Sequence, residues 1–306
     1  DKKGIVYNDW QGDKIKTLEL AQSYVRLEDD DKACKCVECG TYLDFYYDLE
    51  TGVHKLRHAN FCKLRLCPMC IKRRQKKIYH QISAIMNVLS EDYVFVFLTL
   101  TQKNVSGEEL TDEIDNLMKG WEKLSRRTVF KKAVKGWFRA LEVTHNLDVN
   151  SISYDTYHPH FHVLIVVRKG YFTSKEYLSH EAWRELWAKA MRLDYLPQVN
   201  IKKVKGNTAE AVAEVAKYSA KDSDYVIEKD LDLSMNVVET LDYALQGRRL
   251  VSFSGIMKEW HKKLNLDDAE DGDLVHIETE KDEELEGELT LETYAWNVGY
   301  MNYVRV

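Results

Sequence analysis

The stretch YDTYHPHFHVLIVV, residues 154–167, places His158, His160 and His162 at every second position and then runs into five apolar residues. Alternation of this kind predicts a β-strand, whose side chains point to opposite faces in turn. The three imidazoles therefore share one face, and neighbouring ones lie about 7 Å apart along the strand. Two imidazoles at this spacing can lean onto one metal ion, at the entrance to a strand that is buried further along.

The segments on either side of this strand predict a regular alternation of strands and helices. VFVFLTLT (94–101) reads as an apolar strand, and Thr111 begins a helical pattern. GWFRALEVTH (136–145) forms a hairpin with the histidine strand, a second helix begins near Ser174, and QVNIKKVK (198–205) is a further strand. The order strand, helix, strand, strand, helix, strand predicts an α+β fold with a ferredoxin- or RRM-like antiparallel sheet (βαββαβ), helices on one face and the first and third strands in the centre.

Three parts follow from this pattern. Residues 1–90 hold an N-terminal helix and a Cys-rich module, and residues 91–222 hold the core with the histidine strand. Residues 223–306 form a C-terminal extension with an acidic tail. A further Ala-rich helix lies at the end of the core.

Charge is distributed unevenly along the chain, so the net charge of −6 does not exclude a nucleic-acid partner. Residues 54–80 hold nine Lys/Arg and no acid, whereas residues 267–292 hold thirteen Asp/Glu and one lysine. Arg73, Arg74, Lys76 and Lys77 are candidates for contacts with DNA phosphates, with solvated surface charge as the alternative. The acidic tail is typical of a solvated segment. No apolar run long enough to span a membrane and no secretory signal is present, which indicates a cytoplasmic protein.

A mixed nitrogen and oxygen metal site is predicted in the core. His160 and His162 supply imidazoles, and Glu142 on the partner strand of the hairpin is a candidate third ligand. Imidazole and carboxylate donors with open positions suit Mn²⁺ or Mg²⁺ in a catalytic role rather than a closed zinc site. His158, next to Pro159, is expected not to bind. The alternative is a set of polar residues on the open face of a half-exposed sheet.

All six cysteines lie between residues 34 and 70. In a cytosolic chain this clustering favours a metal over disulfides. The pairs Cys36/Cys39 and Cys67/Cys70 form two knuckles that predict a structural Zn²⁺ site. The set of zinc ligands stays open, because Cys62 is close enough in sequence to replace one cysteine, and His54 or His58 can join a second site.

In EAVAEVAKYSAKD, residues 210–222, an acid and a phenol share one face of the predicted helix. Glu210, Glu214 and Tyr218 recur at four-residue spacing, and Lys221 lies one turn beyond Tyr218. This spacing alone is common on helices and is typical of surface hydrogen bonds. It gains meaning only beside the histidine strand.

Three motifs together, FLTLT (97–101), HPHFH (158–162) and EVAKYSAKD (214–222), resemble those of the HUH endonucleases. Their order is that of plasmid rolling-circle replication initiators, and the closest resemblance is to the single-tyrosine Rep family of small Gram-positive plasmids, over residues 36–266. The resemblance makes residues 91–222 an HUH nicking core. It implies that Tyr218 attacks single-stranded origin DNA to form a 5′-phosphotyrosine and free a 3′-OH primer.

The resemblance also implies the remaining roles. His160, His162 and Glu142 would hold the divalent metal, Glu214 would activate water for termination, and Lys221 would orient or neutralise the phosphate. The partners would be plasmid origin DNA, as the single-stranded nick site with its flanking duplex, and a host helicase and polymerase, since the chain has no GxxxxGK[ST] loop. A homodimer is compatible with this reading. Two alternatives stay open: a non-catalytic, zinc-containing nucleic-acid-binding regulator, and a related HUH transposase or relaxase.

Overall fold

The protein is described from a computed structural model, which covers residues 9–204, 212–213, 216, 220–227, 230–277 and 287–306. The chain forms two compact units, each assembled from separate segments. Unit 1 comprises Asp1–Ile5, Gln81–Asp224 and Thr240–Leu266, and unit 2 comprises Val6–His80, Tyr225–Glu239 and Asp267–Val306. Within the described ranges, no helix combines the length and apolarity that crossing a membrane requires.

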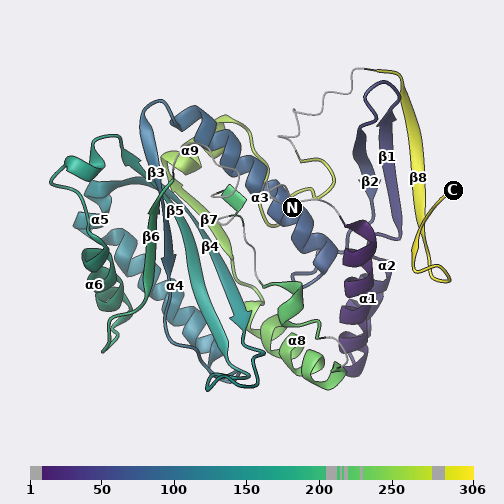
Figure 1. Cartoon of the computed structure of the whole chain (residues 1–306), viewed down its shortest axis with the longest axis horizontal. Helices are drawn as coiled ribbons and strands as arrows, with labels where there is room; N and C mark the ends of the chain where they lie inside the picture. Colours follow the sequence, from purple (N-terminus) through teal and green to yellow (C-terminus); the bar gives the residue numbers. More distant parts are fainter. Residues whose placement is uncertain (1–8, 205–211, 214–215, 217–219, 228–229, 278–286) are drawn as a thin grey trace. The chain divides into compact units, whose positions relative to one another are not determined.

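Unit 1 is built on a five-stranded antiparallel sheet with the strand order β6-β3-β5-β4-β7 (Figure 1). Its strands are β3 (Tyr93–Leu100), β4 (Val134–His145), β5 (Tyr157–Arg168), β6 (Val199–Lys203) and β7 (Val251–Gly255). Its helices include α4 (Leu110–Arg126), α5 (Thr128–Ala133), α6 (His180–Met191) and α9 (Ile256–Lys263). The predicted succession of strands and helices is confirmed from β3 to β6, with the short α5 inserted before β4.

Two details of unit 1 differ from the prediction. The helix expected to begin near Ser174 begins at His180, because the Ser179 side chain accepts a hydrogen bond from the Ala182 amide (3.2 Å) and caps the helix there. The short strand β7, from the region predicted as a C-terminal extension, pairs with β4 as a fifth strand. The edge next to β4 is therefore covered, and β5 lies at the centre of the sheet.

Both faces of this sheet are covered by helices, rather than one face as predicted. The Trp121 ring of α4 packs edge-on against Trp137 of β4 (4.9 Å), and Trp187 of α6 packs against Phe161 of β5 (6.4 Å). On the opposite face His261 of α9 packs against Phe253 of β7 (4.7 Å). Burial on both sides explains the continuous apolar run at the end of β5.

Unit 2 contains a four-stranded antiparallel sheet with the order β2-β1-β8-β9. Its strands are β1 (Tyr42–Asp48), β2 (His54–Ala59), β8 (Leu289–Asn297) and β9 (Asn302–Arg305). Helices α1 (Trp10–Arg26) and α2 (Asp30–Glu38) belong to this unit, while α3 (Pro68–Leu89) and α8 (Leu231–Leu245) contribute residues to both units. Leu43, Phe45, Leu56 and Ala59 form a small core, against which Trp10 packs. The acidic tail thus ends in strand β8, which pairs with β1 of the N-terminal module.

Candidate metal centres

The histidine strand and its hairpin partner bring three metal-binding side chains together in unit 1. Glu142 of β4 lies directly opposite His160 of β5 in the antiparallel register, and His162 points to the same face two residues on. Glu142 Oε2 lies 2.6 Å from His162 Nε2 and 3.3 Å from His160 Nε2. All three side chains are buried, with 2–7% of their surface exposed. The structure therefore brings together the three residues that the sequence predicted as metal ligands.

The spacing of these atoms fits a single divalent ion. The two Nε2 atoms lie 3.1 Å apart, and ligand atoms at right angles around an ion with bonds of about 2.1 Å lie about 3 Å apart. A carboxylate and two imidazoles suit Mn²⁺, Mg²⁺ or a related ion. Within the described residues, this triad is one of two groups that can hold a metal.

Hydrogen bonds fix the orientation of the histidines. His160 Nδ1 lies 2.9 Å from the His158 carbonyl oxygen, which can only accept, so this nitrogen donates and Nε2 presents its lone pair to the centre. The His162 ring stacks on Phe97 of β3 (5.6 Å). His158 is directed away: its Nε2 lies 2.9 Å from the Gln102 carbonyl oxygen, and it is not one of the three clustered groups.

The electrostatics of the triad favour an ionised carboxylate. Burial acts to raise the pKa of Glu142, but its hydrogen bonds and its electrostatic interactions with His160 and His162 outweigh burial and hold the pKa well below its usual range. Burial, followed by the neighbouring His160, lowers the pKa of His158. The centre therefore offers one anionic oxygen with imidazole nitrogens, as a divalent cation requires.

The predicted nucleophile and its helix fall largely outside the described residues. Tyr218 and Glu214 lie there, so their placement is not part of the description. Lys221 is described and exposed. Just after it, the carbonyl oxygen of Asp224 lies 3.2 Å from His145 Nδ1, and His145 Nε2 lies 2.8 Å from Asp155. These contacts attach the end of the tyrosine segment to the last residue of β4, within unit 1, and they were not predicted.

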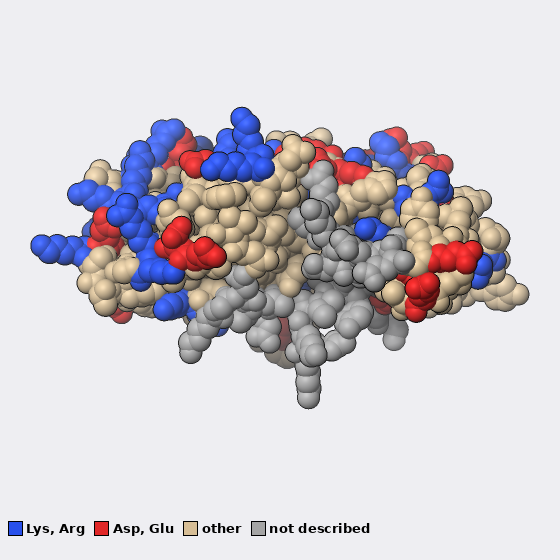
Figure 2. All heavy atoms as spheres, turned by 90° about the horizontal axis from the view of Figure 1, so that it is seen from above, with Lys and Arg blue, Asp and Glu red and all other residues tan. Residues whose placement is uncertain are grey.

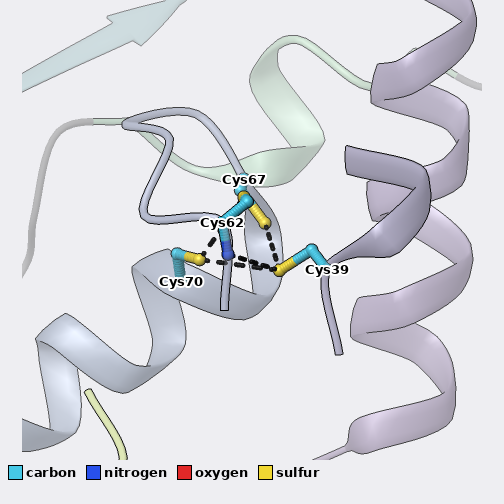
Figure 3. Close-up of side chains that lie close together, drawn as sticks. All are labelled: Cys39, Cys62, Cys67 and Cys70. Atoms are coloured by element: carbon cyan, nitrogen blue, oxygen red, sulfur yellow. Dashed lines mark hydrogen bonds between the residues drawn. The ribbon is translucent and has the colours of Figure 1, made fainter. Parts of the chain in front are cut away.

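A second cluster consists of four cysteines in unit 2 (Figure 3). The sulfur of Cys39 lies 3.6 Å from that of Cys67 and 3.7 Å from that of Cys70, and Cys62 lies 3.7 Å from Cys70. Four sulfurs arranged tetrahedrally around Zn²⁺ at about 2.3 Å are about 3.8 Å apart. The backbone amide of Lys63 also points at Cys70 (3.2 Å), as a donor to a thiolate does. The cluster can hold a closed, sulfur-rich metal site.

The membership of this cluster differs from the predicted set in one position. Cys62 takes the place that the knuckle spacing assigned to Cys36, while Cys39, Cys67 and Cys70 are as expected. Cys36 is buried close by, and its pKa is raised first by a hydrogen bond with Cys62 and then by burial. The spacing of two paired cysteines indicated a site, and the loop before α3 decided which thiols reach it.

Most of the positively charged side chains of helix α3 form contacts within unit 2. Arg73, Arg74 and Lys77 are buried, with 1–3% of their surface exposed. The Arg73 guanidinium donates to the carbonyl oxygens of Leu274 (2.7 Å) and Val275 (2.9 Å), and Lys77 pairs with Asp267. Arg74 likewise donates to backbone carbonyl oxygens, and Lys76 is half-buried. Three of the four residues predicted to contact DNA thus bind the start of the acidic tail in this structure. Their hydrogen-bond donors are occupied there and do not face DNA phosphates.

Comparisons with known proteins identify the family. A family described as "Replication protein" matches residues 53–304. A "Protein rep" from Bacillus amyloliquefaciens is 42% identical, over 97% of this chain and 93% of that protein, and one from Streptococcus pneumoniae is 37% identical, over 96% and 91%. A "Protein rep" from Staphylococcus aureus is 37% identical over 72% of this chain and 96% of that protein. No solved structure matches. The chain therefore belongs to this family of replication proteins, which confirms the resemblance to plasmid replication initiators.

Proposed function

We propose that the protein initiates plasmid rolling-circle replication by nicking one strand of the origin, with the sheet of unit 1 serving as a ferredoxin-like HUH core. The observation that carries the proposal is the buried triad of Glu142, His160 and His162, whose donor atoms all lie within 4.8 Å of one another. Membership of the replication protein family and the motif order support it. A divalent ion bound there, Mn²⁺ or Mg²⁺, would polarise a nonbridging oxygen of the scissile phosphate.

Side chains of the protein would then carry out the separate steps of cleavage. The Tyr218 oxygen attacks the phosphorus, the bond from phosphorus to the 3′ oxygen breaks, and that oxygen leaves as a 3′-OH while the 5′ phosphate stays on the tyrosine. One phosphodiester replaces another, so the step needs no nucleotide cofactor. Lys221 would neutralise the phosphate, and Glu214 would activate water for the cleavage that ends the cycle. Strand separation and synthesis would be left to a host helicase and polymerase.

The cysteine cluster of unit 2 has a structural role in this proposal. Zn²⁺ bound by Cys39, Cys62, Cys67 and Cys70 would join the loop before α3 to the end of α2. A small sheet with few buried apolar residues gains much of its stability from such a cross-link. The zinc would take no part in the cleavage.

The test is the formation of a covalent adduct on single-stranded origin DNA. Incubation with oligonucleotides that tile the origin and with Mn²⁺ should give a protein–DNA adduct on a denaturing gel, and Tyr218→Phe should abolish it. Tyr225→Phe is a matched control, since Tyr225 is buried in unit 2 with its hydroxyl donating to the Leu66 carbonyl (2.5 Å). Glu214→Ala should nick normally and fail at termination. DNA binding without any adduct would instead favour the non-catalytic regulator.

A further inference from the structure

One end of the unit 1 sheet carries a group of cations that the proposed chemistry does not use. Residues 123–135, from the end of α4 to the start of β4, hold six Lys/Arg and no acid. Lys131, Lys132 and Lys135 belong to this run, Arg168 is the last residue of the neighbouring strand β5, and Lys169 follows it. Because Val134 pairs with Val167, the two sets lie at the same end of adjacent strands. We call these five residues the basic end.

The basic end is exposed and its charges are uncompensated. Lys131, Lys132, Arg168 and Lys169 are all exposed, and Lys135 is half-buried with its ammonium on the Lys132 carbonyl. Among the residues that the structure describes, none of the five forms an ion pair with a carboxylate, whereas Arg126 nearby pairs with Glu122. Figure 2 shows Lys and Arg side chains gathered over the part of unit 1 where Figure 1 draws α5 and α6. Cations that form no ion pair attract an anionic partner.

Acidic residues limit the basic end on one side. Glu91 and Asp92 precede β3, whose first residue pairs with Arg168. The positive surface therefore extends from β5 across α5 and β4 and away from β3. Its members come from α5, β4 and the end of β5 rather than from one segment, so the pairing of β4 with β5 sets the spacing of the charges.

The distance from the triad identifies which part of the DNA would reach this surface. Arg168 follows His160 by eight residues on the same strand, which places them about 27 Å apart. The scissile strand bound at the triad would need about eight further nucleotides to span that length, at about 3.4 Å per base pair of duplex. Phosphates this far from the nick belong to the region that flanks it.

We propose that the basic end binds the phosphate backbone of the duplex that flanks the nick site, starting about eight base pairs from the scissile bond. This inference rests on the proposed nicking function, because it takes the triad as the position of the scissile phosphate. The five cations lie on α5, at the start of β4 and at the end of β5, so the sheet fixes their spacing. Such an array suits backbone contacts to duplex DNA, which hold orientation without reading sequence.

The test compares two triple variants that remove the same charge. Lys131→Gln/Lys132→Gln/Arg168→Gln changes the basic end, and Lys119→Gln/Lys189→Gln/Arg192→Gln changes exposed cations of α4 and of α6 with its C-cap. Binding to a 30-base-pair duplex of arbitrary sequence and to a 30-nucleotide single strand is measured by fluorescence anisotropy between about 50 and 200 mM salt, the range over which phosphate contacts are resolved.

The basic-end variant should bind the duplex more weakly and lose about 2.7 from the slope of log affinity against log salt, as expected for three phosphate contacts. The control variant and the single-strand binding of both should keep the wild-type slope. An unchanged duplex slope, or an equal loss on single strands, would overturn the proposal. Adduct formation on single-stranded oligonucleotides is measured in parallel. Absence of the adduct in the wild type would refute the proposed nicking function. An adduct together with an unchanged duplex slope would refute only the role of the basic end.

Discussion

His158, His160 and His162 share one face of β5, but the structure gives them different partners. His160 and His162 turn their Nε2 atoms to Glu142, while His158 bonds to the Gln102 carbonyl. Spacing alone makes the three equivalent, but Pro159 beside His158 predicted that His158 would not bind, and His158 is indeed not among the clustered ligands. The register of the hairpin separates them, because the carboxylate on β4 lies opposite His160 and next to His162.

This difference predicts that substitutions of His158 and His162, on the same face of β5, affect metal binding differently. His162→Ala should weaken Mn²⁺ binding by at least about tenfold, since it removes a nitrogen from the centre. His158→Ala is the matched control, on the same strand and face, and should leave the affinity unchanged. Isothermal titration of the two variants with Mn²⁺ checks this. Equal losses in both would place His158 among the ligands.

The cysteines allow the same kind of comparison in unit 2. Cys62→Ser should abolish stoichiometric Zn²⁺ binding, because Cys62 is one of the four clustered sulfurs, whereas Cys36→Ser should retain one zinc per chain. Both residues lie in the same module, so a general loss of folding would affect them alike. Metal analysis of the purified variants measures the outcome. Zinc lost from Cys36→Ser and kept in Cys62→Ser would restore the ligand set predicted from spacing.

At the scale of elements, the β1–β2 hairpin of unit 2 depends on one buried carboxylate. Asp48 at the end of β1 accepts hydrogen bonds from the backbone amides of Glu50 (2.9 Å), Thr51 (3.1 Å) and Gly287 (3.1 Å). These bonds, that of Thr51 first, lower its pKa to about 2. The side chain therefore holds both the turn after β1 and the residue that leads into β8.

The lowered pKa gives this contact a defined pH dependence. A carboxyl whose pKa falls from about 3.9 in the unfolded chain stabilises the fold above that pH and loses its contribution as the pH drops toward its folded value. The difference in urea midpoint between wild type and Asp48→Asn should therefore be full at about pH 6 and smaller at about pH 3. A difference that stayed constant over this range would show that charge on Asp48 is not what stabilises the hairpin.

Helix α3 was predicted correctly as an element, but its role in the structure differs from the predicted one. Its helical pattern was visible from Lys72 to Leu89, and the structure places it at Pro68–Leu89. Its positive charges predicted a DNA-binding face because no acidic residue lies near them in the sequence. Residues about two hundred positions later supply the carbonyl and carboxylate partners of Arg73 and Lys77, and no local pattern can show such a pairing.

At the scale of the whole molecule, the two metal centres lie in different units, and each unit has its own sheet. Removal of zinc should therefore act on unit 2 and leave the Mn²⁺ affinity of the triad in unit 1 intact. Calorimetry after treatment with a thiol-selective chelator should show loss of one unfolding transition, and titration with Mn²⁺ should still saturate. Loss of Mn²⁺ binding together with the zinc would show that the two units fold as one.

The sequence by itself determined the period-two histidine strand, the hairpin that sets Glu142 beside it and the order of elements from β3 to β6, since each depends on one element or its neighbour along the chain. The order of three motifs between residues 97 and 222 indicated the family. Tertiary structure alone decided that Cys62 joins the cluster, that β7 completes the sheet, that β8 pairs with β1 and that the cations of α3 are buried. The reason is physical: local periodicity determines which face a side chain takes, but long-range packing determines what that face meets.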